Sequence, residues 1–255
     1  DNNYILKLPD IPDEDLPYVS ILTPTLNKRK MFGIAMRNFL LFDYPPEKLE
    51  WVIVDDGDDD EELTDILPRN DHRIKYVKIN NQQDGEHLPV GKKRNLCAEY
   101  ASYKYLVHMD DDDYYPPERV NHAVNRLRSR PEALAVGSSI VYIYFNDLDK
   151  IYQFGPYGPR HATAGTFAFK RELLKQTRYD DNAEIAEEKK FLKDYQVPLI
   201  QLNPMKAILV FAHQYNTFDK RKLLVNANPN YVRETKLKPK LFIRDKTLLE
   251  FYKQI

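Results

Sequence analysis

The chain has 255 residues, of which 42% are hydrophobic and 30% charged, a composition that indicates a folded globular protein and excludes a largely disordered one. Its 38 Lys and Arg residues nearly balance 39 Asp and Glu residues, so the net charge of -1 gives no general attraction to nucleic acid or anionic membranes. The single cysteine, Cys97, excludes an intrachain disulfide and an all-cysteine metal cluster, and no apolar run approaches the ~20 residues of a membrane span.

The first half of the chain alternates predicted strands and helices after an N-terminal arm. Pro9, Pro12 and Pro17 lie among acidic residues, so residues 1–17 are predicted to be extended. Apolar runs and helical spacing then predict strands at 18–22, 51–54, 74–79 and 105–109, and helices at 28–41, 61–67, 91–103 and from 116 to about 130. Asn27 is the predicted N-cap of the first helix. This order is typical of a mostly parallel sheet with right-handed crossovers.

The second half of the chain is predicted to contain more strand. A β-prone stretch at 133–145 pairs with 151–154 in a predicted hairpin, and shorter strands follow at 166–169 and 207–211. The remaining predicted elements are a charged helix at 183–194 and an apolar helix at 241–252.

Three predicted strand ends carry unusual residues, at 23–27, 55–57 and 110–113. In an open parallel sheet, ligands bind beyond the carboxyl ends of the strands, so these three segments are expected to meet at one edge. The four carboxylates at 110–113 repel one another, and a Mg²⁺ or Mn²⁺ ion bound through oxygen ligands would neutralise them. The alternative is a solvated acidic turn.

Two further segments are candidate contacts for a nucleotide. Asp55 and Asp56 could accept hydrogen bonds from a base N–H or a ribose hydroxyl, or they could simply form a turn with Gly57. The cations of Gly91-Lys92-Lys93-Arg94-Asn95 stand at a helix start, where the helix dipole disfavours them. That placement suggests a diphosphate or nucleotide ligand, and the alternative is a solvated basic face.

The motifs occur in a fixed order along the chain. They are VSILTPTLN at 19–27, WVIVDDG at 51–57, GKKRN at 91–95, MDDDD at 109–113 with a following proline, and AGTFAFKR at 164–171. This ordered set, covering roughly residues 18–200, resembles the inverting glycosyltransferases of family 2. The resemblance implies an α/β protein with the Rossmann-like GT-A fold, in which helices flank a mixed, mostly parallel sheet within a single domain.

The resemblance also implies roles for individual residues. The implied donor-binding residues are Thr23, Pro24, Thr25, Asn27, Asp55, Asp56, Lys92, Arg94, Asn95, Asp110 and Asp111. Asp110 and Asp112 would form the D-x-D motif that binds Mn²⁺ or Mg²⁺, with Asp111 an alternative within the run of four. His213 follows a predicted strand and would be a further ligand for metal or phosphate, or it is a structural histidine. Gly165 and Thr166 would line the sugar and acceptor pocket.

The catalytic base of the family lies in a Glu-Asp pair on a helix beyond that pocket. The equivalent pair here is Glu187 and Glu188, with Glu188 at the position of the family's Asp. Glu187 is the alternative base, and an exposed charged helix with Glu–Lys pairs is the alternative interpretation. The implied reaction is one displacement with inversion, in which a sugar passes from a nucleotide-diphosphate sugar, with UDP favoured, to a hydroxyl of a glycan or other acceptor.

Two other functions fit the same fold. One is a degenerate GT-A module that binds nucleotide or glycan without turnover. The other is a sugar-nucleotidyltransferase, which is disfavoured because 23–27 lacks a glycine-rich loop. The chain is divided here into an arm at 1–17, a transferase domain at 18–218 and a C-terminal extension at 219–255 that docks on the body. Within the domain, 18–113 would bind the nucleotide-sugar and 114–218 would form the acceptor and catalytic half.

The cellular setting follows from what the sequence lacks. Without a secretory signal or membrane-spanning pattern, a cytoplasmic protein is expected. The sequence starts at Asp1 without a methionine and is compatible with one part of a longer, multidomain chain. The high Lys and Tyr content and the Glu pair resemble glycosyltransferase domains encoded by large DNA viruses.

Overall fold

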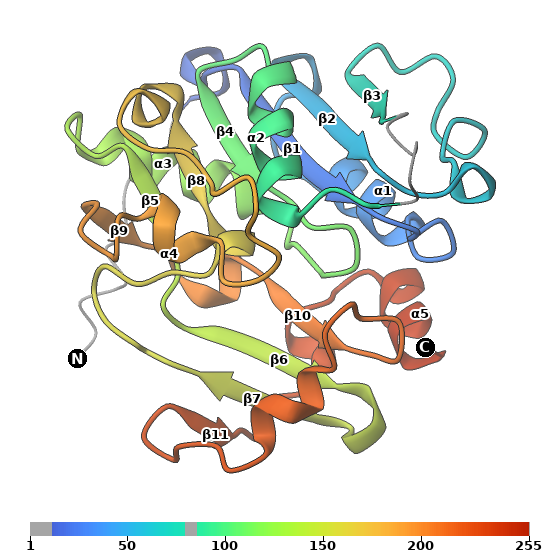
Figure 1. Cartoon of the computed structure of the whole chain (residues 1–255), viewed down its shortest axis with the longest axis vertical. Coiled ribbons are helices and arrows are strands. Elements are labelled where there is room, and N and C mark those ends of the chain that lie inside the picture. Colours follow the sequence, from blue (N-terminus) through green and yellow to red (C-terminus); the bar gives the residue numbers. More distant parts are fainter. Residues whose placement is uncertain (1–11, 80–85, 255) are drawn as a thin grey trace.

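The computed structural model describes residues 12–79 and 86–254, and within them two β-sheets form the framework of the molecule (Figure 1). The strands of the larger sheet are β1 (Val19–Thr25), β2 (Leu49–Asp55), β3 (Ile74–Lys78), β4 (Tyr105–His108), β5 (Ala135–Gly137), β8 (Ala168–Lys170) and β9 (Leu199–Gln201). Their order is β3-β2-β1-β4-β8-β5-β9. The first four are parallel, whereas β8 runs antiparallel to β4 and β5. The expected mixed, mostly parallel sheet is confirmed.

Helices cover both faces of this sheet because its central strands are apolar on both sides. Ile21 and Ile53 pack with α1 (Gly33–Leu41) and α3 (Arg119–Ser129). Their chain neighbours Leu22 and Val54 point to the opposite face and pack with α2 (Val90–Tyr100). This alternation is the period of two that a strand imposes, and it fixes which face each strand-end residue reaches.

The smaller sheet lies below the larger one in Figure 1 and has the order β10-β6-β7-β11. Its strands are β6 (Val141–Phe145), β7 (Lys150–Phe154), β10 (Leu209–Ala212) and β11 (Val232–Glu234). The predicted hairpin is confirmed, since β6 and β7 pair antiparallel. The last helix, α5 (Lys246–Gln254), packs on this sheet, where Tyr252 stacks on Phe211 with ring centroids 3.4 Å apart.

Several predicted elements differ from the structure. The predicted helix at 61–67 is wrong, because only a short 3-10 turn forms at Asp59–Glu61. The helix predicted at 28–41 begins at Gly33, and Asn27 does not cap it but adopts a φ of 51° with its side chain on Asp58. The charged helix predicted at 183–194 shortens to α4 (Glu188–Phe191).

The boundaries of several strands also differ from the predicted ones. β1 continues through Pro24 to Thr25 instead of ending at residue 22 as predicted. Pro24 pairs with Val54 of β2, while the pairing of β1 with β4 ends at Leu22. The stretch 133–145 divides into β5 and β6, and Thr166 lies in a 3-10 turn before β8. Residues 1–11 of the predicted arm and 80–85 of the predicted polar loop lie outside the described residues. Among the described residues, no helix combines the length and apolar character needed to cross a membrane.

Candidate active site

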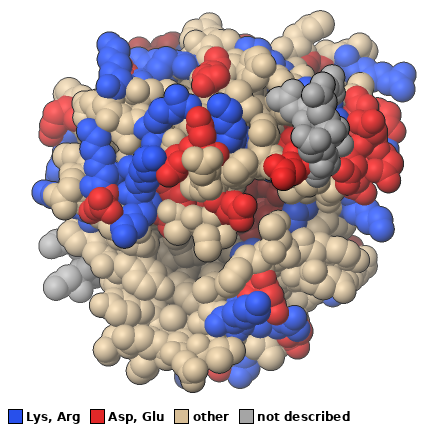
Figure 2. All heavy atoms as spheres, in the orientation of Figure 1, with Lys and Arg blue, Asp and Glu red and all other residues tan. Residues whose placement is uncertain are grey.

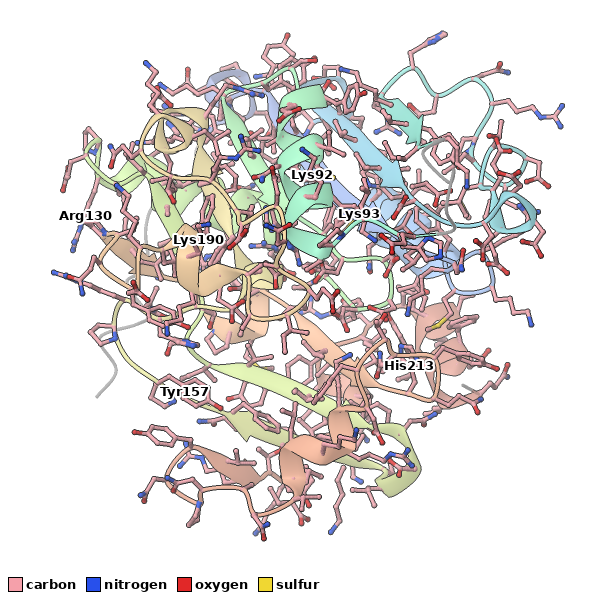
Figure 3. The ribbon with its side chains drawn as sticks, viewed as in Figure 1. Lys92, Lys93, Arg130, Tyr157, Lys190 and His213 are labelled. Carbon is pink, nitrogen blue, oxygen red and sulfur yellow. The ribbon has the colours of Figure 1, made fainter. Side chains whose placement is uncertain are left out.

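The carboxyl ends of β1, β2 and β4 meet at one edge of the large sheet, as the strand-end motifs predict. The ammonium of Lys28, which follows β1, lies 3.2 Å from Asp112, which follows β4. Lys93 of α2 faces both Asp111 and Asp56, which follows β2. Figure 2 shows carboxylates in a hollow at the centre of this face, and Figure 3 places Lys93 and His213 on opposite sides of it.

The four carboxylates at 110–113 differ in their electrostatic environment. Asp110 pairs with Arg94, with Nη1 3.1 Å from Oδ1. Asp112 Oδ2 lies 3.2 Å from the ammonium of Lys28. Burial alone would raise the pKa of Asp112, but the hydrogen bond from His213 and the charge of Lys28 hold it below its usual range. Asp112 is therefore ionised, and each of the two carboxylates is paired with a cation.

The other two carboxylates have raised pKa values. Burial and the charge of Asp112 raise the pKa of Asp111 to about 7 and the pKa of Asp113 well above its usual range. Asp113 Oδ1 accepts a hydrogen bond from Phe211 N at 2.9 Å, which ties the acidic turn to β10. The four carboxylates therefore repel one another less than the sequence indicates, because Arg94 and Lys28 neutralise two of them and proton binding is favoured at the other two. A bound cation is not needed to relieve all of this repulsion.

Arg94 connects the donor motifs to the candidate base. Its guanidinium is fully buried; Nε donates to Glu187 Oε1 at 2.7 Å and Nη1 donates to Asp110 Oδ1 at 3.1 Å. Burial would lower the pKa of Arg94, but the charges of Asp110 and Glu187 raise it well above its usual value. This one side chain joins α2, the end of β4 and the start of α4.

Glu188 is the first residue of α4 and differs from its neighbours on that helix. Burial and the charge of Glu187 raise the pKa of Glu188 to about 7. The side chains of Lys189 and Lys190 are 63% and 64% exposed, so the solvated charged helix describes them but not the glutamate pair. A carboxylate that titrates near neutral pH is suited to act as a general base.

Three predicted site residues use their side chains inside the fold. Thr23 Oγ1 donates to Met109 O at 2.6 Å and accepts from Trp51 Nε1 at 2.8 Å. Thr166 Oγ1 donates to Thr163 O at 2.7 Å and accepts from Ser138 N at 2.9 Å. Both threonines are fully buried, so their hydroxyls cannot reach a donor or an acceptor sugar.

Asn95 is the third such residue. Its amide donates to Tyr179 O at 3.0 Å and to Asp181 Oδ1 at 2.7 Å, and its carbonyl accepts from Tyr179 N at 3.0 Å. Asn95 therefore anchors the loop that leads to α4, and its side chain is not available to bind a ligand.

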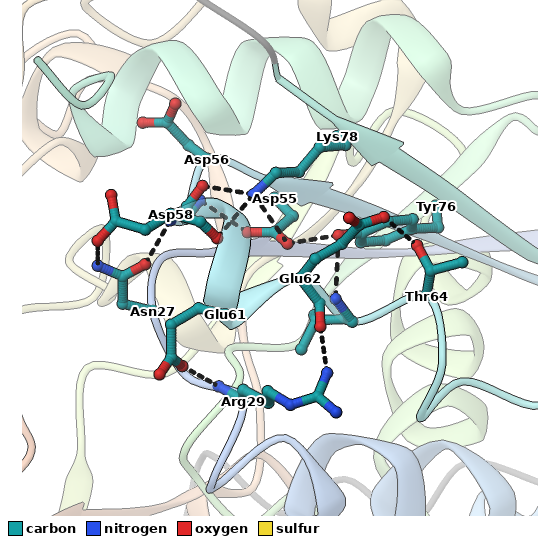
Figure 4. Close-up of polar contacts among 12 residues, drawn as sticks. Asn27, Arg29, Asp55, Asp56, Asp58, Glu61, Glu62, Thr64, Tyr76 and Lys78 are labelled. Carbon is teal, nitrogen blue, oxygen red and sulfur yellow. Dashed lines mark hydrogen bonds and ion pairs between the residues drawn. The ribbon is translucent and has the colours of Figure 1, made fainter. Parts of the chain in front are cut away.

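Asp55 and Asn27 hold the turn after β2 in shape (Figure 4). Asp55 Oδ1 accepts from Gly57 N at 2.8 Å, and its Oδ2 accepts from the Tyr76 hydroxyl at 2.5 Å. Asn27 both donates to Asp58 Oδ2 and accepts from Asp58 N, at 2.8 and 2.7 Å. Asp56 is also engaged, since its Oδ2 accepts a hydrogen bond from Leu88 N. Asp56 is retained as the candidate nucleotide contact because Lys93 faces it more closely than it faces Asp55.

Lys92 and Lys93 point in different directions although they are neighbours (Figure 3). Lys92 is on the outer side of α2, with its ammonium 3.4 Å from Asp181. Lys93 is only 5% exposed, and burial lowers its pKa despite the charges of Asp56 and Asp111. The sequence analysis named Lys92 as a donor-binding residue and did not name Lys93. The signal was present, because Cys97, four residues further on, shows which side of the helix faces the sheet.

His213 reaches the acidic cluster, as predicted, but its ring is already engaged. Its Nδ1 accepts a hydrogen bond from Tyr215 N at 3.1 Å. Its Nε2 lies 2.9 Å from Asn216 Nδ2 and 3.3 Å from Asp112 Oδ2, so both ring nitrogens already have partners. This arrangement favours a role in orienting Asp112 over direct ligation of a metal.

Gly165 borders the cluster from the opposite side. A Cβ at this position would lie 2.8 Å from Asp110 Oδ2 and 3.3 Å from the Tyr115 hydroxyl. Tyr115 also donates to Gly165 O at 3.0 Å. The absence of a side chain at Gly165 leaves room for the Asp110 carboxylate, which supports its predicted position beside the pocket.

Comparison with known proteins relates this geometry to a family. The family model described as glycosyl transferase family 2 matches residues 20–190. A GalNAc(5)-diNAcBac-PP-undecaprenol beta-1,3-glucosyltransferase of Campylobacter jejuni is 31% identical over 100 residues, which are 38% of this chain and 30% of the relative. The poly(ribitol-phosphate) beta-N-acetylglucosaminyltransferase TarS of Staphylococcus aureus is 28% identical over 105 residues, which are 41% of this chain and 18% of the relative.

Solved structures show the same fold at low sequence identity. The mannosyltransferase PcManGT from Pyrobaculum calidifontis, in complex with GDP-Man and Mn²⁺, matches with a TM-score of 0.60 and 19% identity over 82% of this chain and 62% of that chain. S. aureus TarS in complex with UDP-GlcNAc matches with a TM-score of 0.56 and 17% identity over 78% of this chain and 59% of that chain. In each comparison this chain spans less than two thirds of the related protein's length.

The matched family segment begins in β1 and ends in α4, so it contains the three strand ends, Arg94 and the glutamate pair. It covers more than half of the chain. This chain has the GT-A fold and belongs to glycosyl transferase family 2.

Proposed function

We propose that this chain is a metal-dependent inverting glycosyltransferase that moves a sugar from a nucleotide-diphosphate sugar to a hydroxyl of a glycan. The proposal rests on the position of Glu188 at the start of α4 and on its raised pKa. Its pKa is raised to about 7, and its neighbour Glu187 is joined through Arg94 to Asp110 at the candidate donor site. In this proposal Glu188 is a base poised near neutral pH, beside the strand ends where ligands of this fold bind.

In this proposal each group has one task. Asp56 and Lys93 contact the nucleotide, and Arg94 fixes Asp110 relative to the glutamates. Glu188 accepts the proton of the acceptor hydroxyl while the hydroxyl oxygen attacks the anomeric carbon and the bond to the diphosphate breaks. Attack from the side opposite the leaving group inverts the anomeric centre. Glu187 stays paired with Arg94 at 2.7 Å, and its charge helps to keep the pKa of Glu188 high.

The acidic turn fits a hard divalent cation through oxygen ligands. Within the described residues, no group of three or more His, Cys, Asp and Glu side chains is arranged as a metal site. Mg²⁺ and Mn²⁺ need only one or two carboxylates when water and substrate phosphate supply the other ligands. Asp112, which is ionised, would hold the ion, with Asp110 as the second carboxylate. When bound, the ion would offset the charge that develops on the departing diphosphate.

Replacing Asp112 by Asn should abolish the Mn²⁺-dependent part of nucleotide binding. The variant removes the ionised carboxylate but keeps its shape, so Lys28 and His213 retain an acceptor. Isothermal titration with UDP or GDP, in Mn²⁺ and in EDTA, measures the effect. Asp113→Asn is the matched control, because Asp113 favours its neutral form and should bind nucleotide as the native chain does. Equal affinity of Asp112→Asn and the native chain in Mn²⁺ would overturn the metal assignment.

Replacing Lys93 by Met should weaken nucleotide binding about tenfold, as expected for loss of one charged hydrogen bond from a buried site. Lys92→Met is the matched control, because the adjacent lysine points to Asp181 and away from the hollow. The affinities of the two variants are compared in the same titration. If Lys92→Met is the weaker binder, the basic contact to the donor belongs to Lys92, as the sequence first indicated.

A thermal-shift panel identifies the donor class. UDP-, GDP-, dTDP- and CMP-sugars are each tested with Mn²⁺ and with EDTA, because a ligand that binds only the folded chain raises its melting temperature. UDP is favoured by the family resemblance, and TarS has been solved with UDP-GlcNAc, but PcManGT was solved with GDP-Man. A Mn²⁺-dependent shift with one nucleotide class supports the proposal. Binding without any turnover would instead support a degenerate module.

The predicted domain boundaries, cellular location and viral likeness are also proposals. They include the division at 17/18 and 218/219, the cytoplasmic location and the likeness to domains of large DNA viruses. Proteolysis that leaves a stable fragment ending near residue 218 would support the second boundary.

A further inference from the structure

Four aromatic side chains outside the carboxylate cluster form a continuous row, termed here the aromatic row: Tyr231, Tyr157, His161 and Tyr195. Neighbouring ring centroids in this order are 5.2, 4.9 and 4.9 Å apart. Tyr157 and Tyr231 are 43% and 41% exposed, so the row is a surface feature rather than part of the core. Exposed aromatic side chains gathered in one patch are typical of a binding surface.

The backbone that carries the row is fixed by hydrogen bonds. Tyr157 N donates to Ser139 Oγ at 2.8 Å, and Gly155 N donates to Tyr231 O at 2.8 Å. Gln201 Nε2 donates to His161 O at 2.9 Å. Rings held in place before a ligand arrives lose little conformational entropy on binding.

Tyr195 is brought to the row by an unusual backbone. Lys193, Asp194 and Tyr195 have φ values of 50°, 53° and 62°, in the left-handed region that residues with a side chain rarely adopt. Residues in such conformations cluster at functional sites, where the surrounding structure holds them. This turn follows α4 directly, so the row ends at the helix that begins with Glu188, whose charge reaches Tyr195.

The chemistry of the row suits a neutral sugar chain. A sugar ring has apolar C–H faces and hydroxyl edges, which match aromatic rings that also carry tyrosine hydroxyls. Burial lowers the pKa of His161, so its ring is neutral near pH 7. Figure 2 shows that the lower left of this face is mostly uncharged, whereas basic and acidic side chains gather at its lower right; Figure 3 places Tyr157 at the lower left, near the end of β7.

We propose that the aromatic row is the binding surface for a neutral oligosaccharide acceptor of several sugar units. Tyr195 would contact the unit near Glu188, and Tyr157 and Tyr231 would contact units further along the chain. The proposal rests on the proposed function for the role of the sugar chain as acceptor, but not for its binding.

Binding to an array of defined oligosaccharides of two to eight sugars, neutral and acidic, tests the surface. The chain is used as the Glu188→Gln variant with UDP and Mn²⁺, so that no transfer can occur. We expect binding to neutral oligosaccharides that strengthens with length. Tyr157→Ala and Tyr231→Ala should each weaken it about three- to tenfold, as for loss of one aromatic contact. Tyr157→Phe keeps the ring and should retain most of the affinity.

Tyr100→Ala is the matched control, since Tyr100 is also 43% exposed but lies at the end of α2. Melting temperatures with and without UDP show whether each variant is folded and binds nucleotide. No binding to any neutral oligosaccharide, binding only to acidic ones, or equal binding by Tyr157→Ala and Tyr100→Ala would overturn the proposal. Row-dependent binding in a native chain that transfers no sugar would uphold the surface and refute the enzymatic function.

Discussion

Replacing Glu188 by Gln is expected to lower the rate of sugar transfer about 100- to 10,000-fold, the usual contribution of a positioned general base. The amide keeps the shape of the side chain but cannot take a proton. Because the proposed nucleotide contacts are Asp56 and Lys93 and not Glu188, nucleotide affinity should stay as in the native chain. Initial rates at saturating donor, together with UDP titration, separate the two effects.

The pH dependence gives an independent check on the same residue. The pKa of Glu188 is raised to about 7 by burial and by Glu187, and only the ionised form can act as a base. The rate should therefore rise with pH, about tenfold per unit, until it levels near pH 7. A rate that stays constant from pH 5 to pH 8 in the native chain would contradict this assignment.

Glu187→Gln is the matched comparison on the neighbouring position. Glu187 accepts the hydrogen bond from Arg94 Nε, so its replacement should lower the melting temperature and also lower the pKa of Glu188. The pH at which the rate levels should then move to a lower value. If Glu188→Gln transfers sugar normally and a folded Glu187→Gln variant is inactive, the base is Glu187.

The framework of the site could be predicted because it depends on local patterns. The buried runs that became β2 and β4 are continuous and apolar, and each ends at acidic residues. The topology of a parallel sheet then brings the acidic ends together, whatever the details of the side chains. The convergence of 23–27, 55–57 and 110–113 on one edge followed from those two facts.

The direction and charge of single side chains could not be predicted in the same way. Thr23 and Thr25 both lie at the end of β1, yet the hydroxyl of Thr23 is bonded to Trp51 and Met109, whereas the buried hydroxyl of Thr25 has no hydrogen-bond partner among the described residues. The protonation of Asp113 depends on surroundings that include Phe211, which is 98 residues away. Such partners are set by tertiary packing, and one sequence does not specify them.

Replacing Arg94 by Leu should produce the largest loss of stability among these variants. The change leaves the carboxylates of Asp110 and Glu187 without their cation in a site where Arg94 itself is only 5% exposed. Removing one partner of a buried ion pair typically costs about 3–5 kcal/mol, which is on the order of 10 °C in melting temperature for a chain of this size. Arg178→Leu is the matched control, because its pair with Asp181 is 58% and 42% exposed and should contribute little.

The loss of stability in Arg94→Leu could arise from buried carboxylates left without a cation or from lost packing of the Arg94 side chain. Its dependence on pH distinguishes the two causes. Without Arg94, the ionised carboxylates of Asp110 and Glu187 lose their cation, so their charge costs more free energy in the folded chain than in the unfolded chain. Stability contributed by such groups is lost as pH rises, so the melting temperature of Arg94→Leu should approach that of the native chain as pH falls from 8 to 5. Adding Asp110→Asn and Glu187→Gln to Arg94→Leu should recover part of the loss at pH 8. A deficit that is unchanged by pH and by these additions would mean that Arg94 stabilises the fold through packing alone.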